Sequence, residues 1–216
     1  MPSNLRIKVL RKLQSATYRL RNRNRDFTLI SQNCIGGVIY NMLGLQFGTP
    51  TINMFIPGDS FVRLVKDLPH YMSVTPTVLH ENYQDPIDPS ICYPVIALED
   101  VQLHCLHSHS AQEAIADWER RKQRVNLDNV FVIGNTWNFR DCEDQINQLV
   151  DCRYPTVIFT NDTRYSGDTF IVLKENFWKL DARGILRPNI TDFVPGSHKR
   201  YFEERFDFVK WLNKKV

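Results

Sequence analysis

Apolar residues along this chain follow two patterns that alternate over most of its length. Short, nearly continuous apolar runs are typical of buried strands and predict strands at 27–31, 51–56, 94–98, 101–106, 130–133, 157–160 and 170–173. Apolar positions three and four apart predict helices at 38–45, 61–68, 110–125, 141–150 and 201–212. Four prolines and little periodicity predict a long loop or irregular strands at 73–94. The alternation predicts an α/β fold: a mostly parallel sheet flanked by helices in a single domain.

Local signals mark several element ends. Ser110 followed by Glu113 is the capping-box pattern at the start of a helix. Asp141 is expected to cap the helix that follows it. The first helix of the body is expected to end at Gly44 or Gly48, because glycine adopts the left-handed backbone of helix ends readily. The pair Glu99-Asp100, between two apolar runs, predicts a hairpin turn.

The first 25 residues differ in charge from the rest of the chain. They hold eight lysines and arginines and no acidic residue, so residues 26–216 carry −5 of the overall net charge of +3. Apolar residues are interleaved with these bases at roughly helical spacing: Leu5, Val9, Leu10, Leu13 and Leu20. The pattern predicts a basic amphipathic arm (1–25) that projects from an α/β body (26–216). Residues 4–25 would dock on an anionic membrane surface or another acidic partner.

The alternative for this arm is a solvated terminal helix with one face on the body. Nucleic acid is a third partner, but the sequence contains no helix-turn-helix or zinc-finger signature, so none is predicted.

Composition predicts a cytoplasmic protein. The hydrophobic share of 43% and the charged share of 24% are close to the globular average. No apolar run approaches the ~18 residues of a membrane span, and the N-terminus lacks the apolar segment of a signal peptide. The cysteines include no Cys-x-x-Cys pair and are expected to be free thiols: Cys34, Cys92, Cys105, Cys142 and Cys152. The arm would attach such a protein peripherally to the inner membrane face.

Polar residues follow four of the predicted strands directly. They include Gln32, Asn33, Cys34, His107, Ser108, His109, Asn135, Asn161 and Asp162. Parallel strands end at one edge of a sheet, where α/β proteins bind their ligands, so these side chains are expected to gather there. A cysteine, histidines, amides and an acid are the groups that nucleophilic acyl transfer needs.

Cys34 occupies the turn between a predicted central strand and a helix. A thiol at a helix N-terminus faces the positive end of the helix dipole, which lowers its pKa. Gly36 and Gly37 leave the backbone open, so N–H groups of this turn can bind an oxyanion. The competing interpretation is a buried corner thiol, with glycines that permit tight packing.

A base and a group that orients it complete the predicted site. The candidates are His107 or His109 for the base and Asp162 or Asp141 for the orienting acid. The residues predicted to act in catalysis are Cys34, His107 and Asp162. Those predicted to bind substrate are Gln32, Asn33, Gly36, Gly37, His109, Asn135 and Asn161.

Other chemistries lack a sequence signature. His104 and His107 would point to opposite faces of a strand, and no carboxylate accompanies His107 and His109, so no metal site is predicted. The absence of phosphate-binding and dinucleotide-binding glycine motifs disfavours kinases and dehydrogenases. No Asp-x-Asp motif anchors a metal-dependent glycosyltransferase, whereas a metal-independent one stays open.

Four stretches of the chain resemble a known bacterial family. They are FTLISQNCIGGVIYNMLGLQFGTPTINMFI (27–56), VQLHCLHSHSAQEAIADWERRKQRVNLDNVFVI (101–133), TVIFTND (156–162) and FDFVKWLN (206–213). The family is domain of unknown function 1919, whose members are often described as exopolysaccharide or capsule biosynthesis proteins. A family segment that usually reads His-Tyr-Lys is His107-Ser108-His109 here. The Asn-Cys turn is also similar to the nucleophile turn of a capsule acetyltransferase family whose cysteine pairs with a histidine.

The resemblance implies a single α/β domain and a role in cell-surface polysaccharide assembly, without established catalytic residues. With the Cys–His candidates, it leads to the hypothesis of an acyl- or acetyltransferase that acts on a sugar or polysaccharide precursor. Acyl-CoA would be the donor, and no metal would be needed. The alternatives are a metal-independent glycosyltransferase and a non-catalytic partner of the assembly machinery at the inner membrane face.

Overall fold

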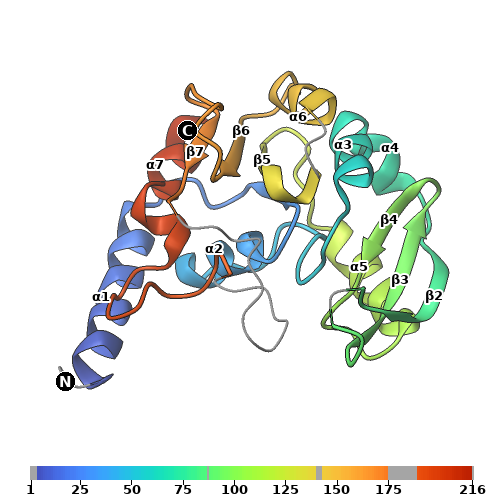
Figure 1. Cartoon of the computed structure of the whole chain (residues 1–216), viewed down its shortest axis with the longest axis horizontal. Helices are drawn as coiled ribbons and strands as arrows, with labels where there is room; N and C mark the ends of the chain where they lie inside the picture. Colours follow the sequence, from blue (N-terminus) through green and yellow to red (C-terminus); the bar gives the residue numbers. More distant parts are fainter. Residues whose placement is uncertain (1–3, 87, 140–142, 175–188, 216) are drawn as a thin grey trace.

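The structure is a computed structural model that describes residues 4–86, 88–139, 143–174 and 189–215 (Figure 1). Its main sheet contains four parallel strands in the order β1 (Thr28–Ser31), β5 (Val130–Asn135), β6 (Thr156–Thr160) and β7 (Phe170–Val172). A smaller antiparallel sheet contains β2 (Thr77–Gln84), β3 (Cys92–Leu98) and β4 (Val101–His104). The predicted α/β class with a mostly parallel sheet is confirmed.

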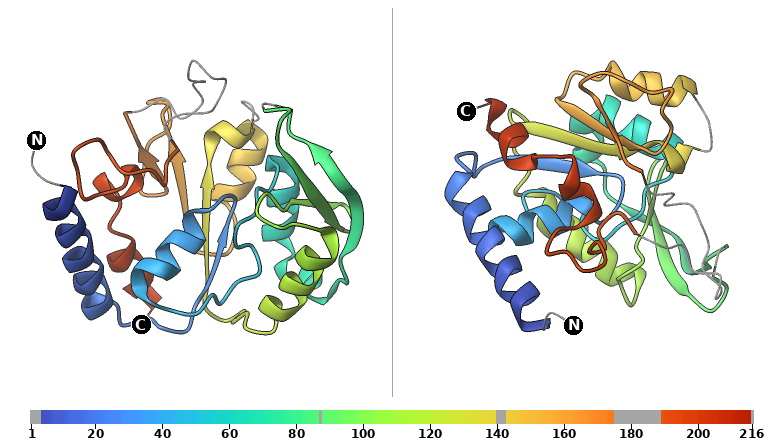
Figure 2. Two further views of the ribbon diagram at one scale, coloured as in Figure 1. Left: turned by 90° about the horizontal axis from the view of Figure 1, so that it is seen from below. Right: turned by 60° about the vertical axis from the view of Figure 1, so that its left-hand side comes forward.

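The parallel sheet is covered on both faces, because successive side chains of its strands point to opposite sides. In β5, Val130 and Val132 join one core cluster, whereas Phe131 and Ile133 join the other. The first cluster includes residues of α3 (Gly58–Lys66), α4 (Leu68–Ser73), α5 (Ala111–Lys122), α6 (Glu143–Val150) and the antiparallel sheet. The second includes residues of α2 (Ile35–Leu43), the 3-10 helix η2 (Tyr201–Glu204) and α7 (Phe208–Leu212). Figures 1 and 2 show these two groups on opposite sides of the sheet.

Three sequence predictions about strands and their pairing are wrong. Residues 51–56 form one isolated bridge, between Phe55 and His104, and Asn53 has a left-handed backbone with φ of 60°, which interrupts an extended run. The hairpin turn at 99–100 is confirmed, but β4 pairs antiparallel with β3 and does not end at the edge of the parallel sheet. β1 is an edge strand rather than the predicted central one.

Helix ends follow local signals more closely. Gly44 ends α2 with φ of 66°, and the Ser110 side chain caps α5 by accepting a hydrogen bond from the N–H of Glu113. The predicted 201–212 helix is divided into η2 and α7, because the Asp207 side chain accepts from the N–H of Lys210 and starts a new helix. The predicted cap at residue 141 lies outside the described residues.

One further helix departs from its predicted bounds, and one of two alternatives for residues 73–94 is favoured. The helix expected at 61–68 begins three residues earlier, at Gly58, and ends at Lys66. Of the two alternatives for 73–94, irregular strands fit better than a long loop, because this stretch contains the eight-residue strand β2 with two register irregularities against β3.

Helix α1 (Asn4–Arg21) forms within the predicted arm but ends before residue 25. It lies against the body over its C-terminal half, as in the alternative of a terminal helix with one face on the body, instead of projecting freely. The Tyr18 hydroxyl donates a hydrogen bond to the buried carboxylate of Glu203 (2.8 Å), and its ring contacts that of Phe208 at a centroid distance of 4.8 Å. Arg21 forms an ion pair with Asp207 at 2.5 Å. Within the described residues, no helix combines the length and apolar character that crossing a membrane requires.

Candidate functional site

The turn after β1 is folded by its own side chains. Ser31 Oγ donates a hydrogen bond to the carbonyl of Asn33 (2.8 Å) and accepts one from the N–H of Gly36 (3.2 Å). Asn33 Oδ1 accepts from the N–H of Ile35 (3.1 Å). Cys34 lies between these residues at the N-terminus of α2, with φ of −67° and no capping bond from its side chain. The turn therefore fixes the position of a half-buried thiol that is not needed to hold the turn itself.

The Cys34 thiol faces an imidazole from a distant part of the chain. Cys34 Sγ lies 3.9 Å from Nε2 of His107, an exposed residue in the loop after β4. The N–H of Ser108 donates to the carbonyl of Cys105 (3.0 Å), which forms the turn that carries His107. A distance of 3.9 Å is long for proton transfer, but catalytic contacts are often loose before substrate binds.

The segment 55–56 brings the two residues together. The N–H of Ile56 donates to the carbonyl of Gln32 (3.1 Å), at the end of β1. Phe55 and His104 exchange two backbone hydrogen bonds of 2.9 Å each, which attaches the same segment to β4. The parallel sheet is thereby joined to the antiparallel one beside the Cys34 turn.

Gln32 and Asn135 connect the ends of two parallel strands from inside the protein. Gln32 Oε1 accepts a hydrogen bond from the N–H of Asn135 (3.1 Å), and both residues are buried. The N–H of Gln32 donates to the carbonyl of Ile133 (3.1 Å). Gln32 Nε2 is buried and has no hydrogen-bond partner among the described atoms. In this conformation the bond between Gln32 and the backbone of Asn135 positions the Cys34 turn, and both side chains are buried away from substrate.

The structure supports a packing role for Gly36 in α2 better than a role in oxyanion binding. The N–H groups of Ile35 and Gly36 are already bonded to Asn33 Oδ1 and Ser31 Oγ, so neither is available to an oxyanion. A Cβ atom on Gly36 would lie 2.5 Å from Ser31 Oγ, which excludes any side chain there without a shift. A Cβ atom on Gly37 would meet Ile52 at an ordinary 3.6 Å. The sequence interpretation of Gly36 as a packing residue is therefore supported.

Burial opposes ionisation of the thiol. Desolvation raises the pKa of Cys34 above its usual value, although backbone hydrogen bonding acts in the opposite direction. The expected lowering of this pKa by the helix N-terminus is wrong, because desolvation dominates. The free protein consequently holds a neutral thiol, and a base must remove its proton before it can react.

Three other predicted residues have different surroundings. The carboxylate of Asp162 accepts from Nε of Arg164 (2.8 Å), which lowers the pKa of Asp162 below its usual range. Asp162 is thus engaged by a cation and not by His107. The backbone N–H of His109 donates to Glu113 (2.7 Å), while its side chain is exposed. Asn161 is exposed directly after β6, and Asp141 lies outside the described residues.

An aromatic cluster beside the site was missed by sequence reasoning. Its rings contact one another at centroid distances of 5.0–5.7 Å and belong to Phe55, His80, Tyr83, Tyr93 and His104. His104 is buried, and desolvation lowers its pKa to about 4. Phe55 and Tyr83 are partly exposed, and both are far in the sequence from every predicted site residue. The pairing of four separate segments makes this cluster, namely residue 55, β2, β3 and β4, so no local signal could reveal it.

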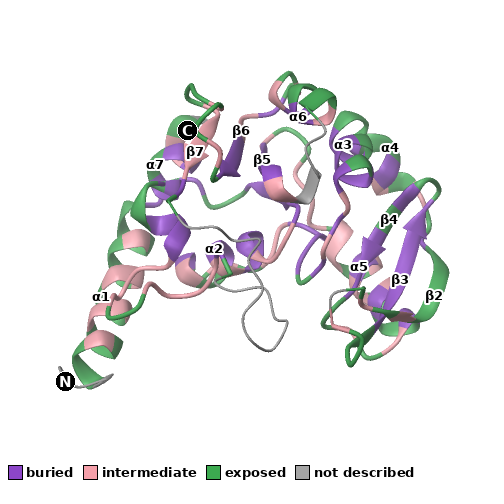
Figure 3. Ribbon diagram, viewed as in Figure 1, coloured by how far each residue is buried: buried purple, intermediate pink, exposed green. Residues whose placement is uncertain are grey.

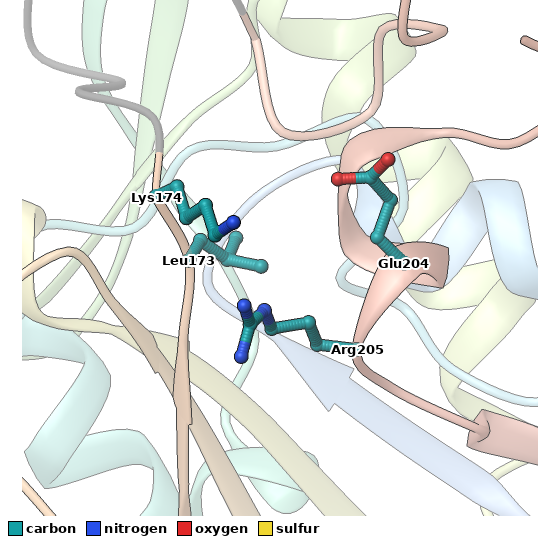
Figure 4. Close-up of a pocket in the computed structure, with 4 residues that line it drawn as sticks. All are labelled: Leu173, Lys174, Glu204 and Arg205. Carbon is teal, nitrogen blue, oxygen red and sulfur yellow. The ribbon is translucent and has the colours of Figure 1, made fainter.

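A pocket of about 390 Å³ opens at the carboxyl end of β7. Leu173 and Lys174 line it from the strand end, and Glu204 and Arg205 line it from the end of η2 (Figure 4). The charged ends of Lys174 and Arg205 point into the space between these two elements. The pocket thus presents two cations and one carboxylate at the same sheet edge as the Cys34 turn.

The described residues contain no group of three or more His, Cys, Asp or Glu side chains arranged to hold a metal ion. Fold and site together define an α/β protein with a cysteine–histidine pair at the carboxyl end of its first parallel strand. The chain belongs to the family described as Domain of unknown function (DUF1919), whose model matches residues 6–213. It is similar to an uncharacterized protein of Haemophilus influenzae, with 26% identity over 194 residues that cover 88% of this chain and 85% of the relative.

Proposed function

We propose that this protein is an acyltransferase of cell-surface polysaccharide synthesis, with Cys34 as nucleophile and His107 as its base. The observation that carries the proposal is the 3.9 Å approach of Cys34 Sγ to His107 Nε2. A thiol beside an imidazole is the minimal pair for covalent acyl transfer. The polysaccharide setting draws its support from the family resemblance of the sequence, and the donor we propose is acyl-CoA.

The reaction has two halves that use the same two side chains. In the first, neutral His107 Nε2 accepts the thiol proton as Cys34 Sγ attacks the carbonyl carbon of acyl-CoA. The acyl–sulfur bond of the donor breaks, and the imidazolium returns its proton to the departing CoA thiolate. In the second, His107 accepts the proton of a sugar hydroxyl, whose oxygen attacks the acyl-Cys34 thioester. The Cys34 sulfur leaves and recovers the proton, so one acyl group has moved without redox change.

The raised pKa of the thiol favours this general-base route over a preformed thiolate–imidazolium pair. A neutral thiol keeps Cys34 unreactive until a donor displaces water and completes the site. His107 must then carry its proton on Nδ1, so that Nε2 is free to accept one.

The surroundings of the pair support an anionic donor and a sugar acceptor. β7 lies three places along the sheet from β1, a separation of about 14 Å at ordinary strand spacing. The phosphates of an extended donor in the Lys174–Arg205 pocket would therefore leave its acyl end within reach of Cys34. The partly exposed rings of Phe55 and Tyr83 offer apolar faces on which the carbon face of a sugar can pack.

A thermal-shift series separates this proposal from its alternatives. Acyl-CoA of several chain lengths, CoA itself and a set of nucleotide-sugars are each added to the full chain. A ligand present at 100 times its Kd stabilises the folded state by about 2.7 kcal/mol and raises the melting temperature. An acyl-CoA that raises it supports the acyltransferase, whereas a response to a nucleotide-sugar alone supports a metal-independent glycosyltransferase. No response to either class supports a non-catalytic partner and contradicts the proposal.

A further inference from the structure

Helix α1 turns four of its apolar side chains toward solvent. Leu5, Val9, Leu13 and Leu20 have exposed fractions of 69%, 48%, 59% and 88%. At 3.6 residues per turn these positions fall within an arc of about 80° on the helix surface. We call these four residues the outer stripe. Figure 3 shows that α1 is exposed or half-buried along its described length, whereas most residues of α2 and α7 are buried.

Basic side chains border the outer stripe on both sides. Lys8 and Lys12 flank it along one edge, Arg6 flanks it along the other, and all three are exposed. Helix α1 contains no acidic residue, and neither do the other residues up to position 25. The surface is therefore apolar at its centre and cationic at its margins.

The opposite face of α1 fixes the helix to the body, so the outer stripe is not an unpacked core face. Gln14 Nε2 donates to Glu203 (2.9 Å), and Tyr18 donates to the same carboxylate. The Arg11 guanidinium lies 3.3 Å from the centre of the Phe193 ring. Because these contacts set the rotation of the helix, the outer stripe points away from the protein.

We propose that the outer stripe is a docking surface for an anionic lipid membrane, on which α1 lies parallel to the bilayer. The four apolar side chains enter the headgroup–acyl boundary, while Arg6, Lys8 and Lys12 contact lipid phosphates. The charge argues against a second copy of the same helix as the occupant, since pairing two outer stripes would place these bases against one another. Arg19 Nε of α1 also donates to the carbonyl of Met42 in α2 (3.2 Å), so attachment holds α2, and with it the Cys34 turn, beside the membrane.

The test uses the full chain and sedimentation with large vesicles. Vesicles of phosphatidylcholine alone are compared with vesicles that contain one-third phosphatidylglycerol, at low salt. The wild-type protein is expected to sediment only with the anionic vesicles, and added salt is expected to release it, because salt screens the attraction. If the protein does not sediment with anionic vesicles at low salt, the proposal is wrong.

Matched variants test which surface is responsible. Val9→Gln with Leu13→Gln removes half of the outer stripe and is expected to weaken binding at least tenfold. Leu79→Gln with Leu127→Gln, two exposed apolar residues elsewhere (42% and 41%), is the control and is expected to bind like the wild type. Because all four side chains are exposed, the melting temperatures should stay close to the wild-type value.

A second pair of variants tests the charge. Lys8→Glu with Lys12→Glu is expected to abolish sedimentation with anionic vesicles, whereas the exposed pair Lys66→Glu with Arg120→Glu should leave it unchanged. If both double variants lost vesicle binding equally, the proposal would be overturned, since the net charge of the protein alone would then explain binding. Concentration-dependent dimers in light scattering that disappear in the Val9/Leu13 variant would assign the outer stripe to self-association instead.

Discussion

Cys34 Sγ lies 3.9 Å from Nε2 of His107, although the two residues follow strands of different sheets and are 73 positions apart in the chain. Segment 55–56 explains this approach, because Ile56 bonds to the end of β1 while Phe55 bonds to β4. The pair is thus positioned by backbone hydrogen bonds on both of its sides. Such placement is typical of sites in which small displacements matter.

A matched pair of cysteine variants separates a functional thiol from a packing thiol. Cys34 is half-buried, whereas Cys105 is fully buried in the core and approaches the carbonyl of Leu103 at 3.5 Å. We expect Cys34→Ser to abolish acyl transfer with little change in the free energy of unfolding. Cys105→Ser should lose about 1–3 kcal/mol, because it buries a poorly bonded hydroxyl, and keep activity in the folded fraction. Chemical denaturation measures the stability of each variant, and a transfer assay measures its activity. A loss of stability in Cys34→Ser, with activity retained in the folded fraction, would mean that Cys34 only fills space at the turn.

The raised pKa of Cys34 predicts how its reactivity depends on pH. The thiolate is the reactive form, so at pH 7 Cys34 should be alkylated more slowly than the exposed Cys92 of the same molecule. The difference should shrink as the pH rises through the raised pKa. Iodoacetamide labelling followed by peptide mass spectrometry gives both rates from one sample. Faster labelling of Cys34 than of Cys92 at pH 6 would show a preformed thiolate and contradict the general-base route.

Two adjacent glycines provide a test of the turn geometry. Gly36→Ala places a Cβ atom 2.5 Å from Ser31 Oγ and 3.2 Å from Ser31 Cβ, and Ser31 is held by its own hydrogen bonds. We expect a loss of about 1–3 kcal/mol from this overpacking. Gly37→Ala meets its neighbours at 3.6 Å or more and should be neutral or gain up to about 1 kcal/mol from the better helix propensity of alanine. Equal unfolding free energies for the two variants would contradict the described turn.

The lowered pKa of His104 predicts that the protein loses stability in mild acid. Desolvation lowers its pKa to about 4 in the folded state, from an ordinary value of 6.5, against the opposing attraction of Asp85 and with a smaller contribution from His80. The unfolded chain therefore takes up the proton first as the pH falls below 6.5. Stability is lost progressively down to about pH 4, by roughly 3 kcal/mol in all.

The variant His104→Phe isolates this contribution, because phenylalanine fits an aromatic cluster and does not titrate. Its free energy of unfolding should fall less between pH 6.5 and 4 than that of the wild type, whatever its absolute stability. Parallel slopes for the two proteins over this range would show that His104 is not the group responsible.

Local features of the fold were predictable from the sequence, whereas pairings between distant segments were not. The left-handed end of α2 at Gly44 and the Ser110 cap of α5 depend on a few adjacent residues, and both were predicted. The placement of β4 outside the parallel sheet depends on its pairing with β3, which an apolar run does not encode. Asn53, with its left-handed backbone, interrupts a run that reads as a strand by hydrophobicity alone.

The candidate site was likewise predictable from local sequence only in part. Cys34 and His107 were chosen because each follows an apolar run, and the structure brings them together by a different route from the shared sheet edge that was expected. Gln32 was predicted to bind substrate, but its bond to the N–H of Asn135 gives it a structural position that only the β1–β5 pairing creates. Polar residues after strands are therefore good site candidates, while their individual roles depend on non-local contacts.

The direct test of the account is detection of an acyl-enzyme. The full chain is incubated with acetyl-CoA and with longer acyl-CoA donors, without acceptor, and the peptide that contains Cys34 is analysed by mass spectrometry over time. We predict one acyl group on Cys34 in the wild type and in Cys92→Ser, much slower acylation in His107→Gln, and none at this peptide in Cys34→Ser. Absence of acyl-Cys34 with every donor, or acylation at the same rate when His107 is replaced, would contradict the assignment of nucleophile and base.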